Sequence, residues 1–419
     1  MVLDFLRALR PLKSVPSRYR RRSYRHMAGS IFIGLFFTTV LVHGPYVIRQ
    51  LGGSALQCLL LNVGRGLPLV PALLWVSLIE RRNPVRLTGL LLGLGGPVLM
   101  LTAFAGTTWS LTLVLTGSMV LVAFFKPAFG TALEQIYPRR WRGRLMSLPW
   151  TGDVLCRAVC LVVVGLILKA SLQSYRWIFP LAGLCMVAGA VILRGIHGSR
   201  GLRVHQVEEM REGFRRRAAR SLKWALSQRR LLAFLLGYFV VTCGGVLLWN
   251  VMPLFASDEL RLTPAQWGYA RAGLLAATVL SFWLWGRFMD RFGAPLTVVI
   301  VWGALAAIAA TMSMVGGAPL FFALMALYGL ANAGNRLAFY PMVMHFTDSA
   351  DTMSGMGLHF SLWGVRWTLM PLAVIVMVDR QMLPMRYIFI IGAALMALGT
   401  VVMALVSRAD RRASAQTQT

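Results

Sequence analysis

The chain alternates between long apolar stretches and shorter polar connections. Twelve apolar stretches approach or exceed the roughly 20 residues that a helix needs to cross the hydrocarbon core of a bilayer. The first six cover residues 28–47, 55–79, 87–105, 109–133, 145–168 and 175–193. The second six cover residues 231–255, 264–285, 295–315, 319–344, 353–376 and 385–406. The pattern predicts an all-α membrane protein with 12 transmembrane helices.

One polar connection is much longer than the others. Residues 195–230 contain Arg215, Arg216 and Arg217 and the acidic pair Glu208 and Glu209, with apolar residues between them. This composition predicts a cytoplasmic linker with one amphipathic helix. The linker separates a bundle of six helices at 28–194 from a second bundle of six at 231–406.

The basic residues are distributed unevenly between the two sides of the predicted membrane. The chain has 43 Lys and Arg against 14 Asp and Glu, a net charge of +29. Of these basic residues, 31 fall in the two tails (1–27 and 407–419) and every second connection, and about six fall on the opposite side. By the positive-inside rule both termini are cytoplasmic. We expect a multi-pass monomer of a bacterial inner membrane.

Several classes of function are excluded by what the sequence holds. Topology accounts for the positive charge, so we expect no nucleic-acid partner, although the basic tail and linker are suited to anionic lipid headgroups. All five cysteines fall within predicted helices and form no metal-ligand pattern. A nucleotide-binding P-loop and a nucleophile triad are both missing. We therefore expect neither an enzyme nor a bound cofactor or metal.

The two bundles match each other at an offset of about 210 residues. Trp75, Glu80 and Arg81 correspond to Trp285, Asp290 and Arg291, and rare intramembrane cations match as well. The matched cations are Lys126 with Arg336, Arg157 with Arg366, and more loosely Arg65 with Arg271. This register predicts two pseudo-symmetric six-helix bundles, a design known in transporters.

One connection carries a motif with four fixed positions. Residues 286–293 read G-R-F-M-D-R-F-G, with Gly286, Asp290, Arg291 and Gly293 in the pattern G-x-x-x-D-R-x-G. This loop resembles the signature loop of the major facilitator superfamily, which the family carries between its second and third and its eighth and ninth helices. The resemblance implies alternating access and a gating role for the four residues. Gly286 would permit close helix approach, and Gly293 would form a tight turn.

The corresponding loop of the first half departs from this pattern. Glu80 stands where the motif has Asp, Arg81 is kept, and both glycines are absent. Near the end of the fourth helix, Glu134 and Arg142 flank Pro138 in a spacing that resembles a second element of the family. The resemblance implies that Glu80, Arg81, Glu134 and Arg142 take part in gating, with Glu134 as a partner of Arg81 or Arg142.

Six cations fall inside predicted helices, where a charge costs at least ~2.5–3.5 kcal/mol on insertion scales. Asp153 precedes Arg157 by four residues, so we predict an ion pair on one helix face. We expect Arg271 to reach Asp258 or Glu259, and Arg336 to extend towards the cytoplasm. The remaining excess of guanidinium groups near the centre favours an anionic ligand, which they can bind bidentately.

These observations give a first set of site residues and three functions. The predicted substrate contacts are Arg65, Lys126, Arg157, Arg336, Arg366, Asn335 and His359, with Arg157 facing Arg366 across the pore and Asp153 as the proton acceptor. The leading interpretation is a secondary active transporter that moves a small anionic solute by alternating access with proton coupling. The alternatives are an exporter of amphipathic or drug-like compounds, and a non-transporting membrane sensor or assembly protein.

Overall fold

A computed structural model gives the fold of the chain. The structure describes residues 16–72, 84–126, 142–196, 227–346, 352–380 and 382–416, together with residues 129, 132, 136, 137, 219 and 223. Within these ranges the regular elements are helices. Most of the linker at 195–230, the loop containing Glu80 and Arg81, and Glu134 lie outside the described residues.

The first bundle contains six helical segments in the described ranges. They are α2 (Ser17–Thr38), which continues through a π-helical turn (Thr39–His43) into α3 (Gly44–Gln50), then α4 (Ala55–Gly66), α6 (Pro84–Met100), α7 (Thr108–Ala123), α9 (Arg142–Ala170) and α10 (Tyr175–Arg194). Each overlaps one of the six predicted stretches. Short 3₁₀ turns extend α4 and α6, at Leu67–Leu69 and Leu101–Phe104.

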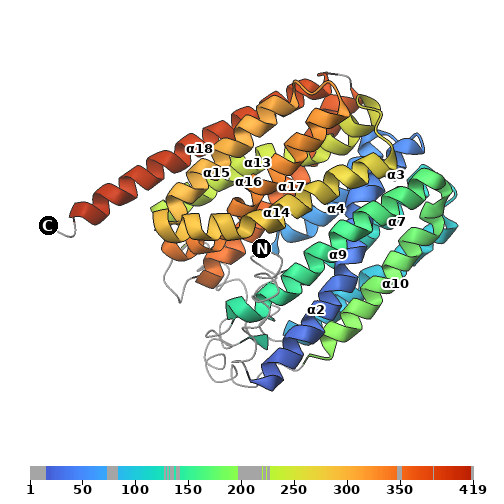
Figure 1. Ribbon diagram of the computed structural model, residues 1–419, viewed down its shortest axis with the longest axis horizontal. Helices are drawn as coiled ribbons and strands as arrows, with labels where there is room; N and C mark the ends of the chain where they lie inside the picture. Colours follow the sequence, from blue (N-terminus) through green and yellow to red (C-terminus); the bar gives the residue numbers. More distant parts are fainter. Residues whose placement is uncertain are drawn as a thin grey trace.

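The second bundle repeats this arrangement. Its helices are α13 (Arg229–Asp258), α14 (Pro264–Phe292), α15 (Ala294–Met312), α16 (Ala318–Phe346), α17 (Thr352–Asp379) and α18 (Met385–Gln416). Seven of the segments in the described ranges are long and apolar enough by themselves to cross a membrane. Figure 1 shows the two bundles side by side, the first in blue to green and the second in yellow to red.

The helix neighbours confirm the internal repeat. In the first bundle α2 packs on α9 and α10, α6 packs on α10 and α7, and α4 packs on α7. In the second bundle the corresponding pairs are α13 with α17 and α18, α15 with α18 and α16, and α14 with α16. The two bundles meet along α4 with α17 and along α9 with α14, which the repeat relates to each other.

Small residues let the two bundles approach at these crossings. A Cβ atom at Gly66 would collide with the backbone of Trp367, and one at Gly364 would collide with the backbone of Leu69 and Val70. At the other crossing Gly268 lies against the backbone of Leu161. Because membrane helices associate mainly through packing, small residues of this kind fix where they cross.

Several helices begin at capping boxes, which satisfy the free amide groups of the first turn. Ser54 and Gln57 cap α4, Thr107 and Ser110 cap α7, and Thr263 and Gln266 cap α14. In the membrane, where each unsatisfied backbone group is costly, such caps help to set where a helix starts.

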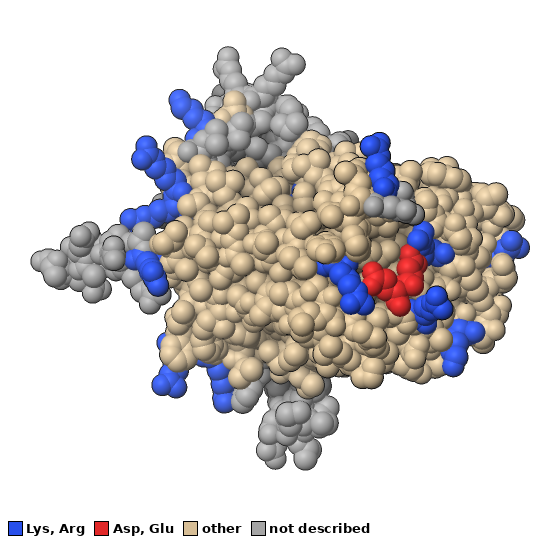
Figure 2. All heavy atoms as spheres, turned by 90° about the horizontal axis from the view of Figure 1, so that it is seen from above, with Lys and Arg blue, Asp and Glu red and all other residues tan. Residues whose placement is uncertain are grey.

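The surface reflects a membrane environment. Large apolar side chains such as Leu113, Val159, Leu280 and Leu405 are more than half exposed. Figure 2 shows a face that is mostly uncharged, with basic residues along its edges and the visible acidic residues in one patch beside basic residues. An exposed apolar surface of this extent is the expected face of a protein toward lipid.

Candidate functional site

The two bundles bring cations and aromatic rings together where α4 crosses α17. Arg65 lies in the last turn of α4, with its Cζ 4.4 Å from the ring centre of Trp367 and 4.9 Å from that of Trp363. Lys126, just beyond α7, places its Nζ 3.2 Å from the Trp363 ring centre. The two indole rings lie 5.3 Å apart. Two cations of the first bundle therefore rest on a tryptophan pair of the second.

This aromatic platform follows from local sequence and helix packing. Trp363 and Trp367 are four residues apart on α17, so both project from one helix face. Gly364 lies between them and brings α17 against the end of α4. The faces of indole rings attract cations by about 2 kcal/mol or more when water is excluded. The platform thus holds Arg65 and Lys126 in place without neutralising their charge.

A cavity of about 240 Å³ opens on the side of the termini, lined by residues of the first bundle and by Arg336 of the second. The ion pair that was predicted on α9 lines it: Arg157 Nε donates to Asp153 Oδ1 at 2.8 Å. Arg336 enters the cavity from α16 of the second bundle. The ion pair is confirmed, and Arg336 joins a shared site between the bundles.

The rest of the cavity wall is largely aromatic. Phe37, Phe125, Phe129 and Trp150 line it together with the small polar residues His26 and Ser30. His26 Nδ1 is 2.8 Å from the hydroxyl of Tyr137. The cavity therefore combines charged with apolar lining residues, as is common where a small organic molecule binds.

Arg366 lies in a second polar cluster, on α17 against α13. Its Nη1 donates to Thr242 Oγ1 at 2.6 Å, and its Cζ is 5.2 Å from the ring centre of Tyr238. His359 lies 5.4 Å from the same ring. Asn335 accepts from Trp302 Nε1 at 3.0 Å. The Nε of Arg366 is buried and has no hydrogen-bond partner among the described residues.

The predicted opposition of Arg157 and Arg366 takes a different form in the structure. Each of the two bonds within its own bundle, Arg157 to Asp153 and Arg366 to Thr242. Arg65 is the residue that links them, because it lies close enough to Arg157, Arg336 and Arg366 for their charges to repel its own. The centre of the cation cluster is therefore Arg65.

The described residues contain few carboxylates that could neutralise this cation cluster. The carboxylates whose side chains the structure describes are Asp153, Asp258 and Glu259. Each is paired with an arginine, Asp258 with Arg49 and Glu259 with Arg386 in addition to the pair on α9. Within the described part of the chain, no carboxylate remains for Arg65, Lys126, Arg271, Arg336 and Arg366.

Arg271 corrects one expectation. It was predicted to reach Asp258 or Glu259, but both acids are taken by other arginines. Its Cζ instead lies 3.7 Å from the ring centre of Trp249 and 5.3 Å from that of Trp267. The guanidinium is 4% exposed, so stacking on indole replaces the ion pair.

The motif of residues 286–293 lies at the end of α14. Gly293 has φ +83° and ψ 161°, a conformation that essentially only glycine adopts, and it ends the helix as predicted. Among the described residues, a Cβ atom at Gly286 would meet nothing within 4 Å in this conformation, so the close helix approach expected for a state closed on the side of the termini stays a prediction. Arg291 is exposed and lies 5.2 Å from the ring centre of Phe292. The side chains of Asp290 and Arg142 lie outside the description.

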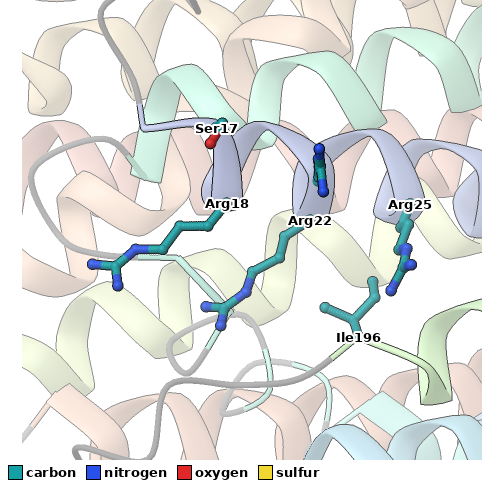
Figure 3. Close-up of a pocket in the computed structure, with 6 residues that line it drawn as sticks. Ser17, Arg18, Arg22, Arg25 and Ile196 are labelled. Carbon is teal, nitrogen blue, oxygen red and sulfur yellow. The ribbon is translucent and has the colours of Figure 1, made fainter.

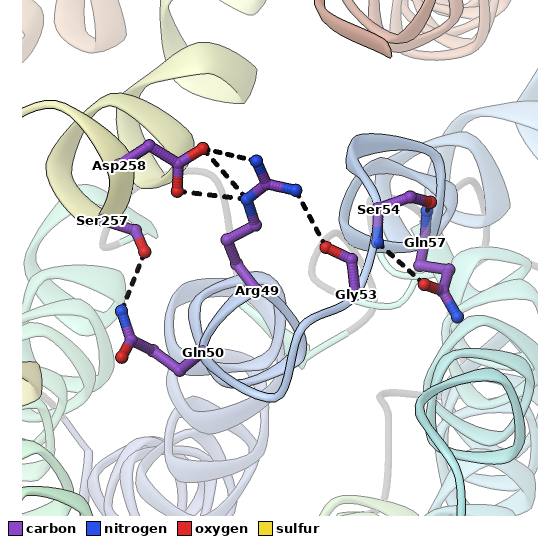
Figure 4. Close-up of polar contacts among 7 residues, drawn as sticks. All are labelled: Arg49, Gln50, Gly53, Ser54, Gln57, Ser257 and Asp258. Carbon is purple, nitrogen blue, oxygen red and sulfur yellow. Dashed lines mark hydrogen bonds and ion pairs between the residues drawn. The ribbon is translucent and has the colours of Figure 1, made fainter.

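A polar network closes the end of the protein opposite the termini, and the sequence did not predict it. Arg49 of α3 donates from Nη2 and Nε to Asp258 of α13 at 2.6 and 3.0 Å, and from Nη1 to the carbonyl of Gly53 at 2.9 Å. Next to it, Gln50 Nε2 donates to Ser257 Oγ at 2.8 Å. Figure 4 shows these bonds between the first bundle and the second.

Further hydrogen bonds join the first bundle to the second next to this network. The hydroxyl of Tyr46 donates to the carbonyl of Leu262, and Trp267 Nε1 donates to the carbonyl of Val42 at 3.1 Å. Buried Asn62 donates from Nδ2 to Asn250 Oδ1 at 2.7 Å. We name the bonds of Arg49 and Gln50 with Asp258 and Ser257 the end latch. The protein is thus closed at the latch and has its cavity on the side of the termini.

Known structures share this architecture. The fold is similar to the crystal structure of a bacterial homologue of the human lysosomal transporter Spinster in its inward-facing, unoccupied conformation. That likeness has a TM-score of 0.65 and 15% identity, over 94% of this chain and 98% of that one. It is also similar to the nucleoside transporter NupG, with a TM-score of 0.68 and 12% identity, over 92% of this chain and 98% of that one.

Sequence comparison agrees with the fold. None of the curated proteins matches the chain in sequence. The family model of the Major Facilitator Superfamily matches residues 234–419, which hold the second bundle and the motif at 286–293. The likeness to the solved structures extends over both bundles. Because the sequence identities are only 15% and 12%, it shows the fold and nothing further. The chain is a multi-pass membrane protein with the fold of these transporters, and its second half matches the model of the Major Facilitator Superfamily.

Proposed function

We propose that the protein is a secondary active transporter that moves a small organic anion across the membrane by alternating access. The observation that carries this proposal is the pair of cations, Arg65 and Lys126, held on a tryptophan platform at the junction of the two bundles without a carboxylate in the described residues. A site between two bundles is the place where rocking exposes a bound solute to each side in turn.

The energetics favour an anionic ligand. A cation at the centre of a membrane helix costs at least about 2.5–3.5 kcal/mol on insertion scales. Cation–π contacts offset part of this cost for Arg65, but the repulsion from Arg157, Arg336 and Arg366 adds to it. A carboxylate or phosphate group bound by guanidinium groups would relieve both, and would do so with bidentate geometry.

Proton coupling is proposed to operate through Asp153. This carboxylate lies at the cavity with Arg157 on one side and Arg336 from the other bundle. Protonation of Asp153 would break its ion pair and free the Arg157 guanidinium for the solute. Protonation and anion binding would then favour each other, because the Asp153 carboxylate and the solute compete for the same guanidinium group.

A second candidate function rests on the aromatic part of the cavity. Phe37, Phe125, Phe129 and Trp150 give the cavity an apolar lining beside its charged residues. Such a wall favours export of amphipathic or drug-like compounds, whose apolar part would lie on it. The two candidates differ in whether the solute needs a negative charge.

The orientation completes the proposal. Both termini lie on the cytoplasmic side by the distribution of basic residues, and the end latch therefore closes the external side. The protein is proposed to act as a monomer without a nucleic-acid partner.

Benzoate and benzamide form a matched pair of probes, because they share a planar ring and differ by one negative charge. We expect benzoate to raise the melting temperature of the purified protein more than benzamide, by mass action on the folded state. Arg65→Gln should weaken benzoate binding about ten- to hundredfold, the value of one charge-assisted contact. The control is Arg386→Gln, which removes an exposed cation far from the cavity.

Two results would count against the anion site. Equal stabilisation by benzamide and benzoate would favour the export of amphipathic compounds. Unchanged benzoate affinity in Arg65→Gln would show that the cation cluster does not bind the probe.

A further inference from the structure

The first two turns of α2 carry four arginines on one helix face. Arg18, Arg21, Arg22 and Arg25 follow the spacing i, i+3, i+4 and i+7, which places them along one side of a helix. Together with Ser17 and with Ile196, just beyond α10, they line an open hollow of about 370 Å³. Figure 3 shows the side chains of Arg18, Arg22 and Arg25 extending from the same side of the helix, with Ile196 below Arg25.

Among the residues that the structure describes, no acidic side chain is paired with this arginine face. The described carboxylates are all paired with other arginines, far from α2's first turns. Arg25 reaches only the carbonyl of Gly195, at 3.5 Å. Arg18 and Arg22 lie over the ring of Tyr19, at 4.7 and 5.5 Å from its centre. The Nη1 of Arg22 is buried without a hydrogen-bond partner among the described residues.

Such an arrangement favours the binding of an anion. Four guanidinium groups repel one another, and they stand at a helix start, where the backbone itself is partly positive. Guanidinium groups bind the oxygens of a phosphate group in a planar, two-pronged geometry. A ligand with one phosphate group could contact two or three of these side chains and the free Arg22 Nη1.

The position of the hollow indicates where that phosphate comes from. The apolar segment that crosses the membrane begins directly after the arginine face, and Ile196 forms an apolar edge of the hollow. The hollow is open and lies at the ends of two membrane helices, α2 and α10, the depth at which lipid headgroups lie. We propose that the arginine face of Arg18, Arg21, Arg22 and Arg25 binds the phosphate headgroup of an anionic lipid.

The test uses two double variants with the same loss of charge. Arg18→Gln with Arg22→Gln removes half of the face, and Arg229→Gln with Arg408→Gln removes two exposed arginines at other helix ends as the control. The full chain is purified in a non-ionic detergent and titrated with phosphatidylglycerol, with phosphatidylcholine of the same acyl chains, and with inorganic phosphate. Melting temperature gives the affinity, and native mass spectrometry counts the bound lipids.

We expect phosphatidylglycerol to raise the melting temperature of the unaltered protein at lower concentration than phosphatidylcholine does. Since each arginine near a lipid phosphate contributes about fivefold in affinity, the Arg18 and Arg22 double variant should bind about 30-fold more weakly. The control variant should bind phosphatidylglycerol as the unaltered protein does. Without lipid, the three proteins should melt at similar temperatures, because the substituted side chains make no contact that holds the fold.

Three results would overturn the proposal. Equal loss of phosphatidylglycerol binding in both double variants would show that binding depends on the net charge of the protein and not on this arginine face. Equal binding of phosphatidylcholine would remove the selectivity for anionic headgroups. If inorganic phosphate saturated the hollow at the same concentrations as phosphatidylglycerol, the hollow would be a site for free phosphate and not for a lipid headgroup. If the Arg18 and Arg22 variant does not fold, Arg18→Lys with Arg22→Lys, which keeps charge but loses bidentate geometry, should show an intermediate affinity.

Discussion

Breaking the end latch should open the protein at that end. Arg49 and Asp258 join the two bundles through three hydrogen bonds between charged groups, and Gln50 with Ser257 adds a fourth bond beside them. Alternating access requires that this contact break each time the latch end opens. Arg49→Gln removes the ion pair while keeping a side chain that can donate a hydrogen bond.

The expected size of the effect follows from the burial of the pair. The side chains of Arg49 and Asp258 are 29% and 25% exposed, so the pair is only partly screened by solvent. Hydrogen bonds to charged groups contribute about 1.5–3 kcal/mol, and partial exposure places this pair near the lower end, at about 1.5–2 kcal/mol. Arg49→Gln should therefore shift the equilibrium towards the open latch about ten- to thirtyfold.

The assay is the distance between spin labels on the two bundles. Ser171 beyond α9 and Arg380 beyond α17 are exposed, lie at the latch end and occupy corresponding places in the repeat. Pulsed electron paramagnetic resonance should show one short distance in the parent protein and a larger, more populated distance in Arg49→Gln. The control is Arg386→Gln, which breaks an ion pair with Glu259 at the same end but within the second bundle.

A charge swap sharpens the test. Arg49→Asp combined with Asp258→Arg should restore the short distance that either change alone loses. An unchanged distance distribution in Arg49→Gln, or an equal shift in Arg386→Gln, would refute the assignment of the latch.

The remaining predictions concern the cavity and the helix crossing. Asp153→Asn removes the carboxylate beside Arg157, and the rate of uptake plotted against pH should lose the step that belongs to proton coupling; a profile like that of the parent protein would exclude Asp153 as the proton acceptor. Gly364→Val would force a side chain into the backbone of Leu69, at a cost of about 1–3 kcal/mol for overpacking, so its melting temperature should fall. Gly286→Ala meets nothing within 4 Å and should leave the melting temperature unchanged or slightly higher; an equal fall in both would contradict the role of the α4–α17 crossing.

The sequence predicted the helices and their repeat because both depend on local signals. Each apolar stretch is long enough to be recognised by itself, and the offset near 210 aligned cations and motif residues that the fold also relates. The ion pair of Asp153 and Arg157 was predicted correctly for the same reason, since four residues on a helix define a shared face.

Contacts between the bundles were not predictable in this way. Arg49 and Asp258 are 209 residues apart, and no sequence signal connects them. Asp258, which is near Arg271 in sequence, pairs instead with Arg49 of the other bundle. Nearness in sequence therefore did not identify the partner in space. The tryptophan platform under Arg65 depends on Gly66 and Gly364 allowing two backbones to touch, which only the packing of α4 on α17 reveals.

Transport by reconstituted protein tests the central claim most directly. Proteoliposomes would be offered radiolabelled organic anions, each beside its neutral amide counterpart, with Arg65→Gln and Arg386→Gln in parallel. We expect accumulation of at least one anion, exclusion of its amide, and loss of uptake in Arg65→Gln but not in Arg386→Gln. Uptake of neutral solutes alone, uptake that Arg65→Gln leaves unchanged, or no uptake of any solute would contradict an anion transporter built on the cation cluster.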